Sequence, residues 1–553
     1  MPAALLLLPV ALLAVGAVLA WAVRRVVPGS GRFIAALAAW GALVALVAIW
    51  SSQRTPLDLT VGELGAGIRL AIRLDAVSFA FGLFLLVPAA LLLTFTSSPS
   101  PPLVVLATAA SLFTVGASGL ILAAFGWGAT LLLVAVLLQA AGEAKPMTTR
   151  LRDQAALLFL LWAGAAIYSR GGTDQYAAIP VSILQPQIFA LVAIASLLAS
   201  GIVPWKAWPA ALWERLRPET AGPATALLFF TGFYFLVRMY EAGGGHYPSP
   251  FANPLLAAAG TACALAATLR AQAAPTRRAY LAETLPIAGG FALLALALGT
   301  PLGIAAAIGT LAVASLLCAL LPLVAEEALT GTVLVALVVS VGLPPTAVFG
   351  TRLLDVQAAL EANEVTGYLG LAAIAAWVIG IAAAARAVRL APRRDAEPSR
   401  SRLGALILVV ALAAGGACLG ALQSVIAIPA AATVLNFPDS ALTGGLYATD
   451  AASGGWPAVA LGGLLAVAVV VLGLGGARFG VAALPAADPA PLFAPRWRSL
   501  PDRLGVLADA LELPVEFRVT EWKRIDLVLT RGSIWLWIVL FAVLAIVVTR
   551  CSG

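Results

Sequence analysis

Residues 199–228 read ASGIVPWKAWPAALWERLRPETAGPATALL, and this stretch holds the feature that decides the fold. An apolar run is interrupted at Pro204, a short amphipathic piece with Lys206 between tryptophans follows, and a second apolar run begins near Gly222. Proline removes a backbone donor and clashes with the preceding helical turn. Lipid tolerates such a break only where protein or a water-filled cavity satisfies the freed backbone groups. The stretch therefore predicts a broken membrane helix that carries a charge, which indicates an ion or proton path rather than a plain anchor.

The composition places the whole chain in a membrane. Hydrophobic residues make up 62% of the 553 residues and charged residues 11%, whereas soluble domains have about 45–50% and about 25%. Mean hydropathy is +1.01. Because about 20 apolar residues cross a bilayer as a helix, we predict an all-α polytopic protein with about sixteen spans. The predicted spans are 3–22, 32–50, 76–96, 102–124, 127–142, 153–169, 186–203, 222–241, 251–269, 282–298, 301–323, 328–349, 366–389, 403–422, 456–477 and 533–549.

The basic loops predict the orientation in the membrane. With this span count, the loops rich in arginine and lysine all fall on one side of the membrane. They include the loops around Arg24, Arg150 and Arg270 and the arginine run at 386–402. Such loops stay in the cytoplasm. We therefore expect a multi-pass protein of the bacterial inner (cytoplasmic) membrane with both termini on the non-cytoplasmic side. The net charge of +7 is then a topology signal, and we expect no nucleic-acid partner.

Cysteine and histidine usage predicts neither a metal site nor a cofactor in this chain. Cys263, Cys318 and Cys418 lie singly within apolar spans, Cys551 lies at the C-terminal end, and His246 is the one histidine. Zinc sites and iron–sulfur clusters need paired Cys or Cys/His spacings, which this sequence lacks.

The polar insertions divide the chain into five parts. Residues 51–75 alternate around Gly65 and Gly67, which predicts a small β-hairpin on the outer face. Residues 423–455 predict an outer loop. Residues 478–532 become amphipathic, which predicts a helix on the membrane surface, with a solvated linker as the alternative. The predicted parts are 1–75 with two spans and the hairpin, 76–392 as the transmembrane core, 393–477 with two further spans and the outer loop, 478–532 as the cytoplasmic-side amphipathic segment, and 533–553 as a C-terminal anchor helix.

Five motifs follow one another along the chain in a characteristic order. They are LAIRLDAVS at 70–78, GIVPWKAWPAAL at 201–212, GPATALL at 222–228, TRRAYLAE at 276–283 and VGLPPTAVFGTRLLD at 341–355. In combination they resemble the proton-conducting, antiporter-like membrane subunits. This family includes the large membrane subunits of respiratory complex I, of energy-converting hydrogenases and formate hydrogenlyases, and of multisubunit sodium/proton antiporters. It also includes the membrane subunit of a bicarbonate/CO2 uptake system. The resemblance covers residues 66–392.

The resemblance implies two inverted repeats, each with a broken helix, and a proton relay along a central axis of a glutamate, lysines and often a histidine. The helix breaks fall at Pro204 and at Pro344 and Pro345. Most relay positions are changed here. Trp127 and Gly128 stand where the family has a glutamate beside a tryptophan, and Ala199 stands at the position of the helix-break lysine. Lys206 occupies the position of the histidine after the break, and Phe229 lies near that of the eighth-span histidine. Pro275 and Thr276 replace an acid–basic pair, and Arg352 replaces the lysine of the second broken helix.

Five charged residues remain as candidates for proton transfer or gating, namely Lys206, Arg352, Asp355, Arg238 and Glu214. Charges inside a membrane are usually functional, and burial can bring a lysine into the titration range, so Lys206 is the best shuttle candidate. Arginine is not deprotonated in proteins, so Arg352 can set a field or gate but cannot pass on a proton. The structural alternatives are a snorkelling Lys206, an Arg352–Asp355 ion pair that caps the broken helix, an interfacial Arg238 with Glu241, and Glu214 paired with Arg215 or Arg217.

These observations leave four functions to weigh. The first is an antiporter-like subunit of a multi-subunit energy-coupling complex, with proton translocation coupled to redox chemistry in partner subunits. The second keeps the fold but has a degenerate channel and mainly a structural role. The third is the membrane subunit of a proton-driven bicarbonate/CO2 uptake system with a zinc-bearing soluble partner. The fourth, an independent secondary carrier, has no substrate-binding constellation to support it.

The motifs place no catalytic centre in this chain. Under the first two functions it would be a subunit of a quinone oxidoreductase or hydrogenase complex. We expect its partners to be other membrane subunits, a soluble catalytic subunit and lipid.

Overall fold

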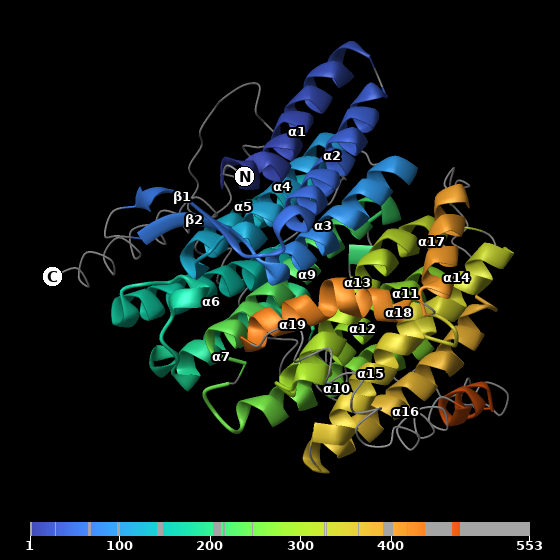
Figure 1. The fold of residues 1–553 in the computed structure, drawn as a ribbon. Helices are drawn as coiled ribbons and strands as arrows, with labels where there is room; N and C mark the ends of the chain where they lie inside the picture. The colour runs from blue at the N-terminus through green and yellow to red at the C-terminus, as the bar shows by residue number, and fades with distance from the viewer. Residues whose placement is uncertain are drawn as a thin grey trace.

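The computed structural model describes most of the chain, and the described part is almost entirely helical (Figure 1). The described residues are 3–27, 29–64, 68–96, 100–140, 147–202, 212–213, 216–245, 247–325, 327, 329–362, 364–390, 402–416, 418–436 and 467–475. Their many apolar helices confirm the predicted all-α, multi-pass membrane fold.

Nine of the described helices are long and apolar enough to cross a membrane, or ten if one bent pair counts as a single span. Four shorter apolar helices lie among them. The predicted count of about sixteen is therefore not confirmed. The predicted span 533–549 lies outside the described residues, as do the amphipathic segment 478–532 and the anchor part 533–553, and the span 456–477 is described only at 467–475.

The N-terminal part consists of two peripheral helices, a hairpin and the first core helix. Its elements are η1 (Ala3–Leu7), α1 (Leu8–Val26), α2 (Ser30–Gln53), β1 (Leu57–Leu64), β2 (Ile68–Leu74) and α3 (Ala76–Phe95). Small residues, among them Gly16, Ala20 and Ala35, lie in the buried stripe between α1 and α2. Such residues let helix backbones approach closely where the surrounding lipid is itself apolar.

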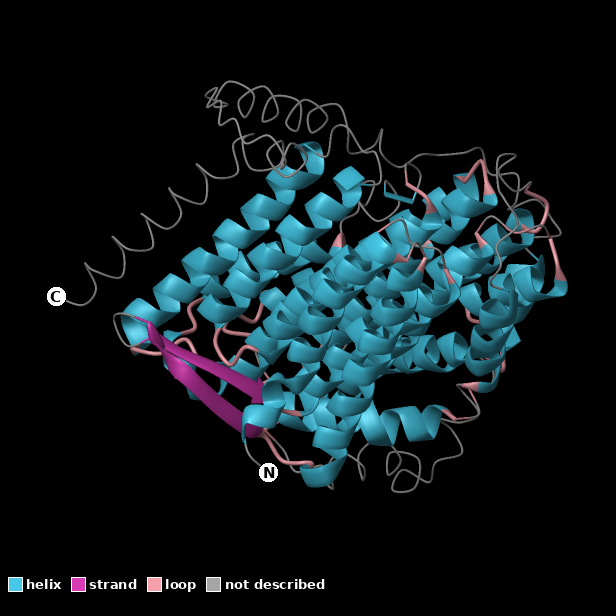
Figure 2. Cartoon of the chain, turned by 90° about the horizontal axis from the view of Figure 1, so that it is seen from above, coloured by secondary structure: helices cyan, strands magenta, loops and turns pink. Residues whose placement is uncertain are grey.

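The β1–β2 hairpin is the one that the sequence predicts within 51–75. Its strands pair antiparallel, with Leu57 opposite Leu74 and Leu64 opposite Ile68. Figure 2 shows it at the edge of the helical bundle, close to the N-terminus. Strand β2 leads directly into α3, and Asp75 is the single residue between them.

The core that follows has two sets of helices in the same order. The first set is α4 (Pro101–Gly116), α5 (Leu120–Ala140), α6 (Met147–Gly171), α7 (Pro186–Ser200) and α9 (Pro218–Ala242), with η3 (Tyr176–Ala178) and η4 (Val181–Ile183) before α7. The second set is α10 (Ala252–Ala273), α11 (Arg277–Ala282) with α12 (Thr284–Ala297), α13 (Pro301–Val324), α14 (Gly331–Val341) with α15 (Ala347–Ala362), and α16 (Glu364–Ala387). We refer to these sets as the N-terminal and C-terminal halves of the core.

Each half contains a short apolar helix that ends at a glycine in the left-handed conformation. Helix α7 ends at Gly201 with φ of 72°, and α14 ends at Gly342 with φ of 70°. This position favours glycine because the Cβ of any other residue would strain the backbone at positive φ. After Gly342 the chain passes Pro344 and Pro345 before α15 begins, whereas Pro204 lies outside the described residues.

The C-terminal region differs from the sequence-based expectation. Helix α17 (Arg402–Ala414) is followed by a sharp bend of 92° and then by a continuous helical segment, which we call the transverse helix (residues 419–435). It comprises α18 (Leu419–Leu422), the π-helical turn η5 (Gln423–Ala427) and α19 (Ile428–Leu435), and it crosses the face of the bundle over α13 (Figure 1). The predicted span 403–422 therefore contains a sharp bend, and residues 423–435 are helical rather than part of an outer loop.

The chain passes close to another backbone segment at a glycine of the bend. Helix α17 packs against α13 and α14, so the chain passes close to the break of the second half. A Cβ at Gly416 would collide with the carbonyl oxygen of Pro345. The close approach of the two backbones therefore requires glycine at 416.

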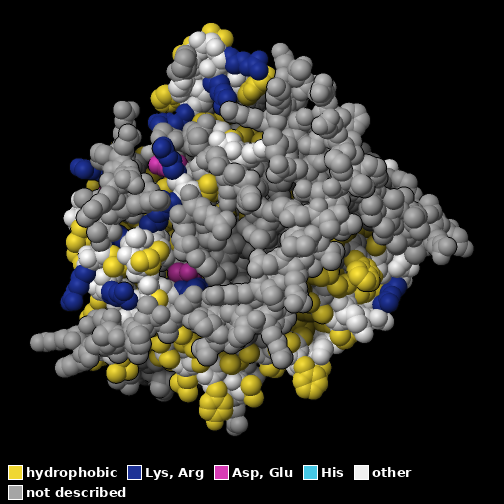
Figure 3. All heavy atoms as spheres, turned by 180° about the vertical axis from the view of Figure 1, so that it is seen from behind, with side chains coloured by type: hydrophobic (Ala, Val, Ile, Leu, Met, Phe, Trp, Pro, Cys, Tyr) yellow, Lys and Arg dark blue, Asp and Glu magenta, His cyan; other side chains and the backbone are white. Residues whose placement is uncertain are grey.

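Much of the surface is apolar, as lipid contact requires. Figure 3 shows apolar side chains along the lower edge of the rear view, while most basic side chains on this face gather toward its left and top. Exposed large apolar residues occur on α1, α2, α16 and α17, for example Leu37, Leu371 and Val410. By contrast, the apolar stretch of α9 is fully buried inside the protein.

Candidate functional site

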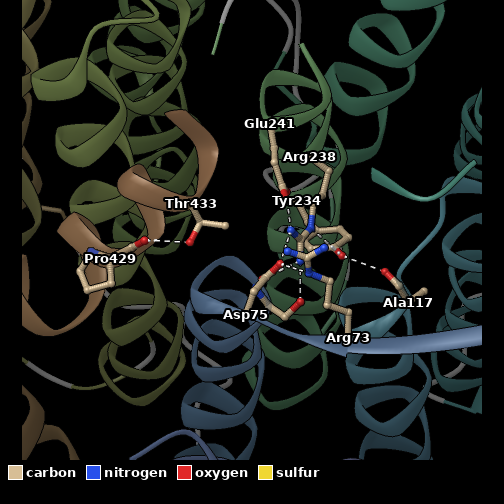
Figure 4. A network of polar contacts seen from close by, with 9 residues as sticks. Arg73, Asp75, Ala117, Tyr234, Arg238, Glu241, Pro429 and Thr433 are labelled. Atoms are coloured by element: carbon tan, nitrogen blue, oxygen red, sulfur yellow. Dashed lines mark hydrogen bonds and ion pairs between the residues drawn. The ribbon is translucent and has the colours of Figure 1, made fainter. Parts of the chain in front are cut away.

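A buried ion network joins α9 of the N-terminal half to the junction of β2 and α3. We call it the Asp75–Arg238 network, and it comprises Arg73, Asp75, Ser78, Tyr234, Arg238 and Glu241 (Figure 4). Asp75 caps the N-terminus of α3 and accepts a hydrogen bond from the Ser78 backbone N–H at 2.8 Å. Aspartate is a favoured N-cap residue because its carboxylate satisfies a free helical N–H. The motif at 70–78 therefore places a carboxylate at the end of a membrane helix.

Arg238, near the end of α9, uses all its guanidinium nitrogens in this network. Its two terminal nitrogens donate to the two oxygens of Asp75, each at 2.8 Å. One of them also donates to Ser78 Oγ at 2.6 Å and the other to Glu241, while Nε donates to the Tyr234 hydroxyl at 3.0 Å. The Arg238 side chain is 1% exposed and Asp75 is 0% exposed. Such bidentate, charge-assisted pairs are the strongest hydrogen bonds that side chains make.

The network is balanced in charge. Arg73 Nε lies 3.0 Å from Asp75 Oδ2, so two arginines face the carboxylates of Asp75 and Glu241. The rings of Tyr234 and Tyr176 lie 5.1 and 5.4 Å from the Arg238 guanidinium carbon. Arg238 and Glu241 lie at the end of α9, and their side chains are 1% and 8% exposed. Their interfacial depth in the membrane stays a prediction.

A small cavity adjoins this network on the side of the peripheral helices. It has a volume of about 30 Å³ and is lined by Arg73 and Ser78 together with apolar residues of α1, α2 and α4. A cavity needs about 10–15 Å³ to hold one water molecule. It can therefore hold one or two waters beside the polar side chains of the network.

The loop before η3 extends the polar contacts beyond the membrane helices. Asp174 Oδ2 accepts a hydrogen bond from the Ile121 backbone N–H at 2.9 Å, which ties the loop to the start of α5. Burial raises the pKa of the Asp174 carboxyl above its usual value, while the hydrogen bond from Ile121 acts in the opposite direction. Tyr176 follows two residues later and reaches the Arg238 network with its ring.

The C-terminal half has a different arrangement, which we call the Arg352 site. Arg352 on α15 is 2% exposed, and its terminal nitrogens donate to the carbonyl oxygens of Val341 at 2.6 Å and Ser340 at 3.2 Å. The Trp377 indole also donates to Val341 O, at 2.9 Å. The last carbonyls of a helix lack intrahelical donors and carry the negative end of its dipole. Arg352 thus satisfies the broken end of α14.

Asp355 lies one turn further along α15 and is 0% exposed. Its Oδ2 accepts a hydrogen bond from the Thr310 hydroxyl of α13 at 2.6 Å. Among the described residues, the ion pairs within 4.0 Å do not include Arg352 with Asp355. Arg352 therefore caps the broken helix, as one alternative proposed, but it does so without the ion pair to Asp355.

Further arginines hold the loops of the C-terminal half together at its basic end. Arg270 pairs with Glu283 at 3.1 Å. Arg277 donates to the carbonyl oxygens of Glu327 at 2.8 Å and Leu390 at 2.9 Å, which joins the loops after α13 and α16. Arg386 donates to Gln272 O. These arginines therefore connect neighbouring helix ends and loops through hydrogen bonds and an ion pair.

Three of the predicted site residues, Pro204, Lys206 and Glu214, lie outside the described residues. Of the other relay positions, Trp127 and Phe229 are buried apolar side chains, and Trp127 packs edge-on against Phe235 with ring centroids 6.2 Å apart. Arg238 and Arg352 lie in different halves and are not brought together. Groups of three or more His, Cys, Asp or Glu that could hold a metal do not occur among the described residues.

Sequence reasoning missed Asp75 as a partner of Arg238. Asp75 stood inside a quoted motif, but it is 163 positions from Arg238, so spacing carried no signal for the pair. A usable signal was the charge at the boundary of a predicted strand and an apolar helix. Gln423, which is buried in the transverse helix, was missed because its segment read as a loop.

No protein-family model matches the sequence, and no curated protein matches it. Solved structures do match the fold. A chain of the Mrp complex from Dietzia sp. DQ12-45-1b has 20% identity and a TM-score of 0.72 over 99% of this chain and 63% of that one. This chain thus spans less than two thirds of the length of that Mrp chain.

Two respiratory assemblies match over a smaller share of this chain. A chain of the membrane-bound sulfane sulfur reductase, an archaeal respiratory membrane complex, has 19% identity and a TM-score of 0.64 over 74% of this chain and 75% of that one. A chain of respiratory complex I from Thermus thermophilus has 20% identity and a TM-score of 0.64 over 78% of this chain and 99% of that one. The protein is thus a multi-pass membrane protein with the fold of membrane subunits of Mrp and complex I assemblies, as expected for a divergent antiporter-like subunit.

Proposed function

We propose that this protein is an antiporter-like membrane subunit of a multi-subunit, proton-coupled energy-coupling complex, and that partner subunits carry out the redox chemistry. The observation that carries the proposal is one buried, arginine-centred site in each half of a fold that Mrp and complex I subunits share. Desolvating a charge in a membrane core is expensive, and such charges usually serve ion or proton pathways.

The buried arginines act in this proposal as fixed charges and not as proton carriers. Arg238 faces two carboxylates, and Arg352 faces the carbonyl end of α14. An arginine keeps its proton in any protein environment. The 553 residues include three lysines, Lys145, Lys206 and Lys523. The subunit therefore contributes to proton translocation through the field of its buried charges, without a relay of lysines.

The partner proteins test the first part of the proposal. Purification of the intact complex in a mild detergent, followed by mass spectrometry, should recover further membrane subunits together with a redox-active soluble subunit. Recovery of a lone zinc protein related to β-carbonic anhydrases would instead support inorganic-carbon uptake and contradict the redox-coupled proposal.

Proton translocation by membrane vesicles that contain the intact complex tests the second part. We expect Arg352→Gln to lower substrate-driven acidification at equal amounts of assembled complex, since it removes a buried charge. Lys206→Ala should leave the rate unchanged. Arg389→Gln, at an exposed position beyond α16, is the matched control for loss of an arginine. A normal rate in Arg352→Gln, or a lost rate in Lys206→Ala, would overturn the fixed-charge part.

A further inference from the structure

The turn between α1 and α2 carries a group of basic side chains at one end of the peripheral helices. Arg24 and Arg25 lie in the last turn of α1 and Arg32 in the first turn of α2, and we call these three the turn arginines. Both helices are long and apolar enough to cross a membrane, and residues 27–29 separate them. The turn therefore lies at a membrane surface whichever way the protein is oriented. Figure 1 shows this end of α1 and α2 at the top of the molecule, beyond the ends of the neighbouring helices.

Carboxylates do not match the charge of the turn arginines. Residues 1–57 contain four arginines and no aspartate or glutamate. Within the described ranges of the chain, the ion pairs closer than 4.0 Å do not include a turn arginine. The basic end of the C-terminal half differs, since Arg270 pairs with Glu283 and Arg277 donates to two backbone carbonyls. The α1–α2 turn thus offers its positive charge to a partner outside the described residues.

Contacts within the turn hold two of these side chains in place. The Arg25 guanidinium carbon lies 3.7 Å from the centroid of the Trp21 ring, one turn earlier on α1. A guanidinium stacked on an aromatic face keeps its N–H donors free for an anion. Arg24 packs against the start of α2, where a Cβ on Gly31 would be 3.0 Å from the Arg24 Cβ. The glycine at 31 therefore brings the basic end of α1 next to Arg32.

Large apolar side chains are exposed beside the turn arginines. Val26, Val27 and Phe33 are 81%, 52% and 71% exposed. The Arg32 guanidinium carbon lies 5.7 Å from the centroid of the Phe33 ring. Cations interleaved with apolar and aromatic side chains are typical of segments that enter the headgroup region of a membrane, because acyl chains cover the apolar groups while the charges meet anionic headgroups. The surface therefore fits a lipid better than a soluble partner.

We propose that the turn arginines bind the headgroup phosphate of an anionic phospholipid. Arginine matches phosphate because its planar guanidinium donates two parallel hydrogen bonds to two phosphate oxygens. Basic residues next to a membrane helix attract anionic lipids through the same charge. Trp21 is the positioning residue for Arg25, and Gly31 keeps Arg24 beside the start of α2. This site goes beyond the function proposed above and holds for any complex that contains the subunit.

Binding of phosphatidylglycerol to the purified full chain tests the site. Native mass spectrometry counts the lipid molecules retained by the chain as phosphatidylglycerol is titrated into the detergent, with phosphatidylcholine as the zwitterionic comparison. The triple variant Arg24→Gln, Arg25→Gln, Arg32→Gln should weaken the tightest phosphatidylglycerol binding by roughly a hundredfold, because each basic residue near a membrane surface contributes roughly fivefold in affinity. Its binding of phosphatidylcholine should equal that of the unchanged chain.

A second triple variant is the matched control for the loss of charge. Arg54→Gln, Arg170→Gln and Arg389→Gln together remove three exposed arginines from separate parts of the surface, and this protein should bind phosphatidylglycerol as the unchanged chain does. Trp21→Leu should weaken binding by about two- to fivefold, since Arg25 loses its stacking partner. Equal phosphatidylglycerol binding by the two triple variants, or displacement of the lipid by an equal concentration of inorganic phosphate, would overturn the lipid site. Size-exclusion chromatography checks that each variant is folded.

Discussion

The two halves of the core bury an arginine in opposite ways. In the N-terminal half, Arg238 faces the carboxylates of Asp75 and Glu241, so its charge is matched by side chains. In the C-terminal half, Arg352 faces the last carbonyls of α14, and the nearest carboxylate on its own helix, Asp355, is bonded to Thr310 instead. One charge is compensated by ions and the other by a helix end.

This difference shows what each half can do. A balanced group of ions is rigid, since moving one member leaves its partners buried without a counter-charge. A helix dipole supplies only about half an elementary charge, and only near the helix end. The Asp75–Arg238 network is thus matched in charge by direct ion pairs, whereas Arg352 has no carboxylate within ion-pair distance among the described residues. The two arginines should therefore differ in what their removal costs.

The largest effect is expected from breaking the balanced network. Arg238→Met leaves Asp75 and Glu241 buried next to each other with only Arg73 as a counter-charge. Removing one partner of a buried ion pair destabilises a protein by about 3–5 kcal/mol. The measurement is the free energy of unfolding in detergent, with size-exclusion chromatography as a check on folding.

The double variant Arg238→Met with Asp75→Asn is the control for this prediction. It removes one of the two carboxylates and should recover part of the loss. A single variant as stable as the wild type would show that the charges of the N-terminal half are not energetically coupled.

A smaller effect is expected at the break of the C-terminal half. Arg352→Gln removes a charged donor from the carbonyls of Val341 and Ser340, but Trp377 still donates to Val341 O. A hydrogen bond to a charged group contributes about 1.5–3 kcal/mol, so the loss should lie in that range and below that of Arg238→Met. Arg352→Lys, which keeps the charge, should be closer to the wild type. An equal loss for Arg238→Met and Arg352→Gln would remove the distinction between the halves.

A matched pair of tyrosines sharpens the comparison at the level of single hydroxyls. Tyr280 OH lies 3.2 Å from Ser340 Oγ in the C-terminal half. Tyr240 OH in the N-terminal half is enclosed without a hydrogen-bond partner among the described residues. Tyr280→Phe should therefore cost about 0.5–1.5 kcal/mol in unfolding free energy, while Tyr240→Phe should cost nothing. Equal losses for the two variants would contradict these assignments.

Sequence reasoning reached the features that depend on local chemistry. The hairpin within 51–75 follows from backbone preferences of the residues themselves, whereas the break at Pro344 and Pro345 was implied by the family resemblance of its motif. Spans follow from hydropathy in the same way. Arg352 was placed at a broken helix because the resemblance aligns it with the lysine of the family's second broken helix.

Contacts between distant segments could not be reached in this way. Hydropathy does not say which helices enclose a charged residue, so Arg238 near the end of an apolar run read as interfacial. Its partner Asp75 is brought to it only by packing of α3 against α9. The transverse helix was missed for a related reason, since its bend at Gly415 and Gly416 depends on the approach of the backbone near Pro345.

The smallest effect concerns Asp174, at the end of the N-terminal half that faces the hairpin. Burial raises the pKa of its carboxyl above 3.8, so the folded protein holds this proton more tightly than the unfolded chain. Its contribution to stability is therefore complete below the pKa of the unfolded chain and is lost as the pH rises through the folded-state pKa. Asp174→Asn keeps an acceptor for the Ile121 N–H and removes the titration, so its unfolding free energy should fall less between acidic and neutral pH. Unfolding of both proteins in detergent across this range measures the difference. Parallel pH profiles of the two proteins would show that Asp174 is as well solvated in the folded protein as in the unfolded chain. The buried, charge-matched Asp75–Arg238 network would then end at Tyr176 and would not extend to the loop at Asp174.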